Sequence, residues 1–466
     1  FAALKMAGVP YYVENIARQF LSRYHAERGL WEKMLADLEK NPDAREPLAR
    51  MPSLCSRTFA EAYAKELQRH AAQYKTEGPL FYSLASEPSV TRLAAAYDFD
   101  FHPEAMQEFR RWLERDAYGT LSALNEYWGT GFKSWAEVVP MTTPEARMRL
   151  KDGVNNYGPW YDFRAFQDLM FAKTIREGAA VIRREDPKAR VGITGAMGPF
   201  AFGGWDWVRL ADALDVVEAY DIGGARALWR DLTYGKPALA VLPLSPDPAS
   251  LQETRRTLWS LALDGGPRAA MLWDEAPGGE GARVLLDGEG KPTPAANVLA
   301  PVLRELDGPL GLLTAKLRRT RGGVAILYSP ASVRLNWLFE ADHLHGDDCM
   351  KAWGADTSAE RRESLQLRLR ESWCKLLADL GLPWWFVSSA QIEAGELANP
   401  DTGPRAVVLP RACALSDKEA EALKIFAAGG GIVLVDAFCG RFDEHGRERK
   451  KPALDELFRN IFKENR

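Results

Sequence analysis

The stretch that decides the fold is residues 79–90, PLFYSLASEPSV. Its apolar run from Leu80 to Leu84, interrupted only by Ser83, is typical of a buried parallel strand. Pro88 cannot donate a hydrogen bond to a strand ladder, so we expect the strand to end near Glu87. The sequence therefore predicts a carboxylate at the C-terminal end of a buried parallel strand, where α/β proteins place catalytic side chains. The alternative is a glutamate that only begins a surface loop.

Around this stretch, strand-like and helix-like segments alternate. After the strand at residue 79 the expected helices are 105–118, 121–128, 163–184, 205–214, 225–234 and 251–264, and the expected strands are 190–194, 215–220, 237–242 and 269–273. Such alternation predicts parallel βαβ units. Residues 9–15 are a further strand candidate, which brings the count to six. A closed (β/α)8 barrel needs eight strands, so we expect a barrel truncated at its N-terminus, with its first two strands upstream of Phe1.

A second unit is expected after a Gly- and Lys/Arg-rich boundary near residues 306–323. Strands are expected at 324–328, 383–387, 406–409 and 431–436, with helices at 360–380 and 417–428. This pattern predicts a small doubly wound α/β domain of the flavodoxin or amidotransferase type. We therefore expect a barrel domain over residues 1–310 and a second domain over 322–466.

Composition excludes several classes of function. The chain has 466 residues, 27% of them charged, and a net charge of −4, so nothing indicates a nucleic-acid partner. Five scattered cysteines form no CxxC pair, so no metal site is predicted. No run of 18 apolar residues is present, so no membrane partner is expected. The 15 tryptophans agree with a sugar site and equally with a large aromatic core.

Two segments carry a resemblance to a known family. The ending Ser86–Glu87–Pro88 resembles the Asn-Glu-Pro ending of strand four in retaining glycosidases built on β/α barrels. Residues 109–130, FRRWLERDAYGTLSALNEYWGT, contain a Tyr-Gly turn and a Leu-Asn-x-x-Trp-Gly segment. Both resemble the insertion after strand four in the β-galactosidases of glycoside hydrolase family 42. The resemblance implies a glycosidase that needs no cofactor and acts on a carbohydrate, with a second domain that builds a homotrimer in the intact protein.

Glycoside cleavage needs two carboxyl groups on either side of the scissile bond. By the resemblance, Glu87 matches the family's general acid/base, and the nucleophile belongs at the end of strand seven. That strand reads Leu-Ala-Val-Leu-Pro-Leu over residues 239–244, and no carboxylate follows until Asp247. The sequence does not decide which residue supplies the second carboxyl group. The candidates are Glu275, Asp274, Asp247 and, with less support, Asp221.

Other residues are expected to contact the sugar. The resemblance implies that Trp273 forms an aromatic platform, that Glu280 binds the sugar and that Ser86 replaces an asparagine that holds the sugar 2-hydroxyl. Asn15 is a candidate to line the pocket, and Tyr220 a candidate to donate a hydrogen bond to a carboxylate; a turn asparagine and a core tyrosine are the alternatives.

Three hypotheses follow from the sequence. The first is a glycoside hydrolase cleaving a β-linked sugar, with Glu87 as proton donor. The second is a related barrel that has lost its nucleophile and only binds carbohydrate. The third is an oligomeric scaffold whose second domain builds the assembly.

Overall fold

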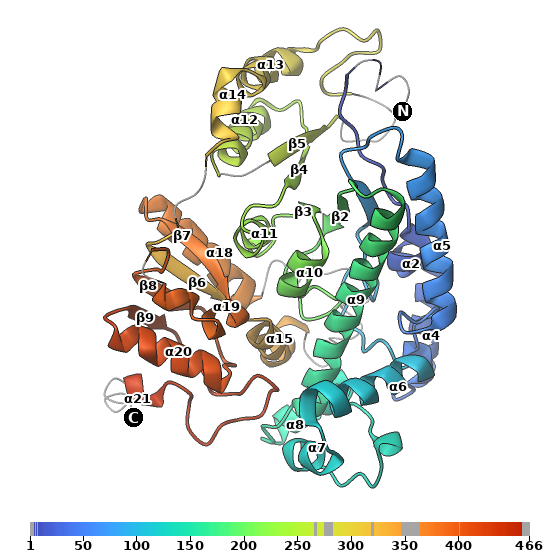
Figure 1. Cartoon of the computed structure of the whole chain (residues 1–466), viewed down its shortest axis with the longest axis vertical. Helices are drawn as coiled ribbons and strands as arrows, with labels where there is room; N and C mark the ends of the chain where they lie inside the picture. The colour runs from blue at the N-terminus through green and yellow to red at the C-terminus, as the bar shows by residue number, and fades with distance from the viewer. Residues whose placement is uncertain are drawn as a thin grey trace.

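The computed structural model describes residues 4, 6, 8–264, 268–274, 283–317, 321–345, 364–399 and 401–458, with the side chains of 268 and 341–345 excepted. Its first part is a five-stranded parallel sheet in the order β1-β2-β3-β4-β5 (Figure 1). Each strand pairs with the next strand along the chain, so the sheet is wound in one direction, as a barrel wall is. The strands are β1 Tyr82–Ser86, β2 Val191–Ala196, β3 Val216–Ala219, β4 Ala238–Pro243 and β5 Arg268–Trp273.

Helices precede and join these strands. Before β1 come α2 Arg18–Leu21, α3 Arg23–Ala26, α4 Arg28–Lys40 and α5 Arg57–Tyr74, and after it come α6 Pro103–Trp112, α7 Leu121–Trp128, α8 Thr143–Lys151 and α9 Gly158–Glu185. The later connections are α10 Trp207–Ala213, α11 Ala225–Leu232 and α12 Pro248–Leu263, and α13 Pro294–Asp307 and α14 Pro309–Thr314 follow β5. The alternation predicted from the sequence over β1–β5 is therefore confirmed to within a few residues. A π-helical turn, Leu113–Tyr118, replaces the end of the helix expected at 105–118.

The strand expected at residues 9–15 does not form, so this part of the sequence prediction is wrong. Only Val13 forms a bridge, parallel to Tyr82, although its N–H donates to the Phe81 carbonyl and its carbonyl accepts from Ser83. Asn15 has a φ of +59°, which turns the chain out of the extended conformation. Residues 9–15 thus line β1 as an irregular edge and form no named strand.

Close helix packing supports the sheet. The long α9 lies beside α5 on the outer side of the first sheet (Figure 1). Gly178 makes this approach possible, because a Cβ there would lie 2.3 Å from the Tyr63 hydroxyl oxygen. Gly178 thus serves the packing of the core rather than a turn.

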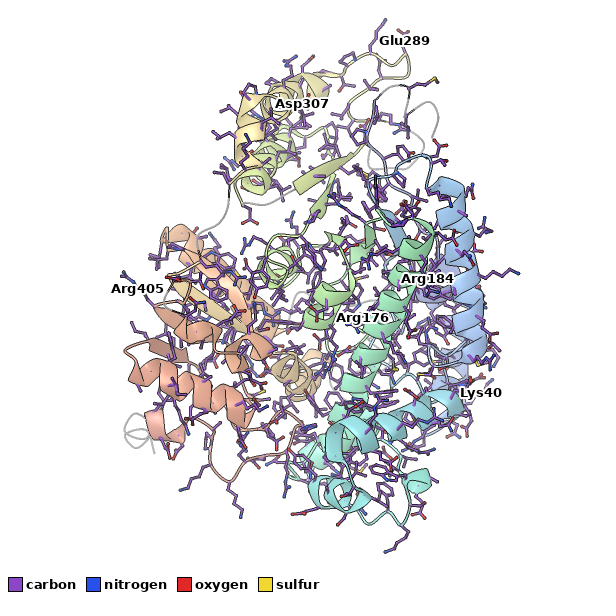
Figure 2. All side chains as sticks on the ribbon, viewed as in Figure 1. Lys40, Arg176, Arg184, Glu289, Asp307 and Arg405 are labelled. Atoms are coloured by element: carbon purple, nitrogen blue, oxygen red, sulfur yellow. The ribbon has the colours of Figure 1, made fainter. Side chains whose placement is uncertain are left out.

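Charged side chains such as Lys40, Glu289 and Arg405 lie at the outer edge of the molecule (Figure 2).

The second part is a parallel sheet in the order β7-β6-β8-β9. Its strands are β6 Val324–Tyr328, β7 Trp384–Ser388, β8 Ala406–Leu409 and β9 Ile432–Val435, and its helices include α15 Pro330–His345, α18 Leu365–Asp379, α19 Ser389–Glu393, α20 Asp417–Ala428 and α21 Asp455–Phe458. The strand order reverses direction after β6–β7, which is the arrangement of a doubly wound sheet. None of the described helices is long and apolar enough to cross a membrane.

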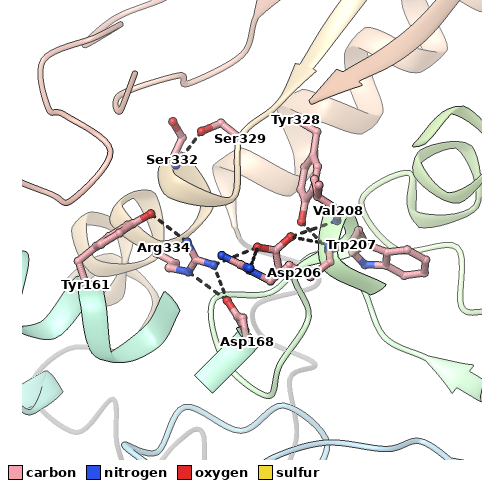
Figure 3. A network of polar contacts seen from close by, with 10 residues as sticks. Tyr161, Asp168, Asp206, Trp207, Val208, Tyr328, Ser329, Ser332 and Arg334 are labelled. Carbon is pink, nitrogen blue, oxygen red and sulfur yellow. Dashed lines mark hydrogen bonds and ion pairs between the residues drawn. The ribbon is translucent and has the colours of Figure 1, made fainter. Parts of the chain in front are cut away.

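A buried ion-pair network joins the two parts (Figure 3). The Arg334 guanidinium on α15 donates to Asp168 of α9 at 2.5 and 3.1 Å, to Asp206 at 3.3 Å and to the Tyr161 hydroxyl at 2.9 Å. Arg334, Asp168 and Asp206 are each more than 90% buried. Burial lowers the pKa of Arg334, but Tyr161 and the two carboxylates outweigh it and raise that pKa, so Arg334 stays charged.

The loop of the second part that carries His445 also contacts helix α9 of the first part. His445 Nδ1 lies 2.7 Å from Oδ1 of the fully buried Asp162 in α9, whose other oxygen accepts hydrogen bonds from Tyr118 and Trp128. Burial lowers the pKa of His445, but the charge and hydrogen bond of Asp162 prevail and raise it to about 9. The Tyr-Gly and Trp-Gly segments of the sequence resemblance thus serve to enclose a buried carboxylate.

Replacing Arg334 with alanine is expected to lower the free energy of unfolding by about 3–5 kcal/mol, because it leaves the buried Asp168 without its hydrogen-bonded counter-charge. Urea denaturation measures this change. Arg57→Ala is the control, since it removes an exposed pair with Glu61 that solvent screens, and it is expected to change the stability little. Equal costs for the two variants would contradict the role given to Arg334.

The His445–Asp162 pair predicts a pH dependence of stability. The pKa of His445 is raised from 6.5 to about 9 in the folded state, so its contribution is fully present below pH 6.5 and is lost as pH rises to about 9. The contribution is on the order of 3 kcal/mol. Denaturation of the wild type and of His445→Gln at several pH values is expected to give a difference that shrinks over this range. A difference independent of pH would contradict the pairing.

Candidate active site

The end of β1 turns sharply at Glu87. The Glu87 N–H still donates to the Thr194 carbonyl of β2 at 2.8 Å, but its φ is +51°, and Pro88 follows without an N–H. A left-handed glutamate is uncommon and costs free energy, so the surrounding structure must hold it in place. The side chain of Glu87 is 22% exposed. The carboxylate thus lies half-buried at the C-terminal end of the parallel sheet.

Two ring side chains contact the two oxygens of this carboxylate. The Tyr220 hydroxyl, just after β3, donates to Oε1 of Glu87 at 2.7 Å. His25 Nε2, on α3, lies 3.0 Å from Oε2. The hydrogen bond that the sequence suggested for Tyr220 is therefore present, and its acceptor is Glu87. Contacts at both oxygens fix the plane of the carboxyl group.

Two more carboxylates lie near Glu87. Glu218, near the end of β3, is 4% exposed and accepts a short hydrogen bond from the Gly195 N–H. Burial raises the pKa of Glu218, and the negative charges of Glu14 and Glu87 raise it further. Burial and the same acidic surroundings, Glu14 and Glu218, raise the pKa of Tyr12 to about 12. The mouth of the sheet is therefore strongly acidic and favours protonation of its most buried carboxyl group.

Gly195 supplies the space for Glu87. Its φ is +61°, and a Cβ at this position would lie 2.6 Å from Cγ of Glu87 and 2.9 Å from the Glu87 nitrogen. The irregular pairing of β1, β2 and β3 around this residue frees the Gly195 N–H for Glu218. A single glycine therefore separates two carboxylates.

Backbone contacts position the segment before Glu87. The Asn15 side-chain oxygen accepts a hydrogen bond from the Ser86 N–H at 2.6 Å. The Ser86 carbonyl in turn accepts from the Ser22 hydroxyl at 2.6 Å. Asn15 thus acts on the main chain beside Glu87.

The second-carboxyl candidates lie in other surroundings. Asp247 caps α12 and accepts from the backbone and hydroxyl of Ser250, contacts that lower its pKa. Asp274 accepts from the N–H groups of Val284 and Leu285, both at 2.7 Å. Asp221 pairs with Arg226 at 2.6 Å. Each of these three carboxylates is therefore engaged by residues close to it in the chain.

The remaining predicted residues lie at the end of β5 and after it. Trp273 ends that strand with 55% of its surface exposed, and its role as an aromatic platform stays a prediction. Glu275 and Glu280 lie outside the described residues. Their predicted roles stay predictions.

Sequence reasoning missed Glu14, His25 and Glu218. Glu14 and Glu218 lie near the C-terminal ends of strand-like segments, so the rule that selected Glu87 also selects them. Nothing in the sequence pairs His25 with Glu87, because the contact joins residues 62 positions apart through the docking of α3.

A separate cavity of about 580 Å³ lies between α11, β4, α12 and α18, with Arg230, Asp264 and Trp384 among its lining residues. Its lining includes Asp221 but not Glu87, so the candidate site is defined by chemistry rather than by volume. The described residues contain no cluster of three or more His, Cys, Asp or Glu suited to a metal ion.

Comparison with known proteins places this geometry in context. Residues 48–224 match the sequence model of glycoside hydrolase family 42, described as "Beta-galactosidase". A β-galactosidase, BgaA, from Planococcus sp. strain 'SOS Orange' is 34% identical over 116 residues. That segment is 23% of this chain and 16% of the Planococcus protein.

Solved structures of the same class share the fold. The β-galactosidase of Bacillus circulans sp. alkalophilus has a TM-score of 0.64 at 16% identity, covering 98% of this chain and 71% of that one. The Marinomonas ef1 enzyme has a TM-score of 0.59 at 16% identity, covering 87% and 63%. This chain therefore spans less than two thirds of the Marinomonas protein, and the structural likeness concerns the fold alone.

Gly195→Ala is expected to destabilise the protein and displace Glu87. Gly78→Ala is the matched control, because Gly78 has a similar φ of +65° with open space around its Cβ position. We expect the control to cost about 1–2 kcal/mol from backbone strain. Gly195→Ala is expected to cost about 1–3 kcal/mol more from the overlap with Glu87. Urea denaturation of both variants measures the difference, and equal costs would mean that Glu87 does not need this space.

Proposed function

Since these similarities support the assignment of the chain to glycoside hydrolase family 42, we propose that it is a glycoside hydrolase that cleaves a β-linked sugar, with β-galactosides as the first substrates to test. Glu87 is the proposed general acid/base. The observation that carries this proposal is its carboxyl group, half-buried at the C-terminal end of a parallel strand and contacted at both oxygens by Tyr220 and His25. Fixed geometry of this kind is what proton transfer to a leaving oxygen requires.

The second carboxyl group is proposed from a wider set than the sequence offered. Glu275, Asp274 and Asp247 remain candidates. Glu218 and Glu14 join them, because the charges of Glu14 and Glu87 both raise the pKa of Glu218. The separation of the two groups decides the outcome, with about 5–5.5 Å for retention and about 6.5–9.5 Å for inversion. Ser86, Asn15, Tyr220, Trp273 and Glu280 are the proposed sugar contacts.

The proposed architecture follows the same assignment. The five-stranded sheet is interpreted as part of a (β/α)8 barrel in a domain over residues 1–310. Residues 322–466 are the proposed second domain, which contributes to a homotrimer. The one-way strand order of the first sheet and the reversed order of the second support this division.

A second candidate function is carbohydrate binding or scaffolding without catalysis. It is favoured by the end of β4, where Leu242, Pro243 and Leu244 stand in place of a carboxylate. A binder of this kind would bind galactose without hydrolysing any galactoside.

Glu87→Gln is expected to keep the fold, because glutamine preserves the shape of the side chain and one hydrogen-bond acceptor. It is expected to lower kcat/KM by about 10²-fold or more on aryl β-galactosides with poor leaving groups, which need a proton. Substrates with very good leaving groups are expected to lose less in the first step. Steady-state kinetics on such a series provides the measurement.

The series also separates the two candidate functions. A wild type that binds galactose but hydrolyses none of the substrates would support the non-catalytic function. An active wild type whose Glu87→Gln variant keeps its full rate on poor leaving groups would show that another residue is the acid.

A further inference from the structure

The contact between His25 and Glu87 joins helix α3 to the end of strand β1. His25 lies on α3, which precedes β1 in the chain, and its Nε2 is 3.0 Å from Oε2 of Glu87. Tyr220 contacts the opposite oxygen from the end of β3. Residues from two separate elements therefore contact the two oxygens of the Glu87 carboxyl group.

Hydrogen bonds on both sides of Glu87 fix α2 and the residue Ser22 from which α3 begins. Upstream of Glu87, the Ala17 N–H donates to the Leu84 carbonyl at 2.7 Å and the Ser22 hydroxyl donates to the Ser86 carbonyl at 2.6 Å. Downstream, the Ser89 N–H donates to the Leu21 carbonyl at 2.9 Å. The backbone that carries His25 cannot shift relative to Glu87 without breaking these bonds.

The surroundings of the imidazole indicate which of its nitrogens carries the proton. His25 Nδ1 is buried and has no hydrogen-bond partner among the described residues. A proton there would be an unsatisfied buried donor, which costs more free energy than a bare lone pair does. Neutral His25 is therefore expected to carry its proton on Nε2 and to donate it to Glu87.

This arrangement opposes the strain at Glu87. The residue has a φ of +51°, and its side chain fits only beside a glycine. A strained residue persists where neighbouring contacts over-determine its conformation, and such residues cluster at functional sites. Without His25, Tyr220 would be the only described residue whose side chain contacts the carboxyl group of Glu87.

We propose that His25 is a positioning residue for Glu87, which holds the carboxyl plane and donates to its ionised form through Nε2. The inference rests on the proposed function, in which Glu87 carries the proton of the reaction. His25 touches Glu87 rather than the sugar in this arrangement. Its loss should therefore lower kcat with little change in KM, as expected for an interaction that matters in the transition state.

The kinetic test uses His25→Ala and His25→Gln in the full chain. On an aryl β-galactoside, His25→Ala is expected to lower kcat/KM by about 10- to 100-fold, the scale of a misplaced catalytic group. Added imidazole is expected to restore part of the rate by filling the cavity, and His25→Gln to retain more activity than alanine because its amide can donate. His70→Ala is the control, because His70 Nε2 lies 3.1 Å from Glu66 on α5 in a similar His–Glu contact.

A crystallographic test separates this inference from the proposed function. Structures of the wild type and of His25→Ala are expected to show Glu87 in one orientation and in several, respectively, whether or not any galactoside is cleaved. An inactive wild type would reject the proposed function, while this comparison would still decide the role of His25. The inference is overturned if Glu87 stays in one orientation in His25→Ala, or if His70→Ala loses as much activity.

Discussion

The buried Arg334 guanidinium is the interaction on which the arrangement of the two sheets depends. It neutralises Asp168 and Asp206, which lie on α9 and at the start of α10. Tyr328, at the end of β6, accepts a hydrogen bond from the Trp207 N–H at the same point. Since α10 follows β2 directly, the second sheet supports the strand that carries Gly195. The described residues of the second part thus act on the candidate site through packing.

The candidate site combines strain, crowding and negative charge. Glu87 takes a left-handed conformation, and Gly195 gives it room. Burial of Glu218 beside Glu14 and Glu87 favours protonation of one carboxyl group over the others. Environments that separate the proton affinities of neighbouring carboxylates are how acid and base roles are divided in many enzymes. The carboxyl groups of the candidate site therefore differ in the surroundings that set their proton affinities.

Much of the fold was predictable because local patterns and tertiary structure agree. Buried parallel strands appear as continuous apolar runs, and the helices between them are amphipathic, so β1–β9 lie close to their expected positions. Residues 9–15 are the exception. They have the apolar character of a strand, but the left-handed Asn15 and the docking of α2 and α3 against β1 leave only the bridge at Val13.

By itself, the sequence determined the alternation of strands and helices and the place of Glu87 at a strand end, because both depend on residues adjacent in the chain. Only the tertiary structure decided which groups meet there. The contacts of Glu87 with His25 and Tyr220 span 62 and 133 positions, and the space for its side chain comes from Gly195 on the neighbouring strand. Such contacts arise from the pairing of strands and the docking of helices, and no local pattern in the sequence records them.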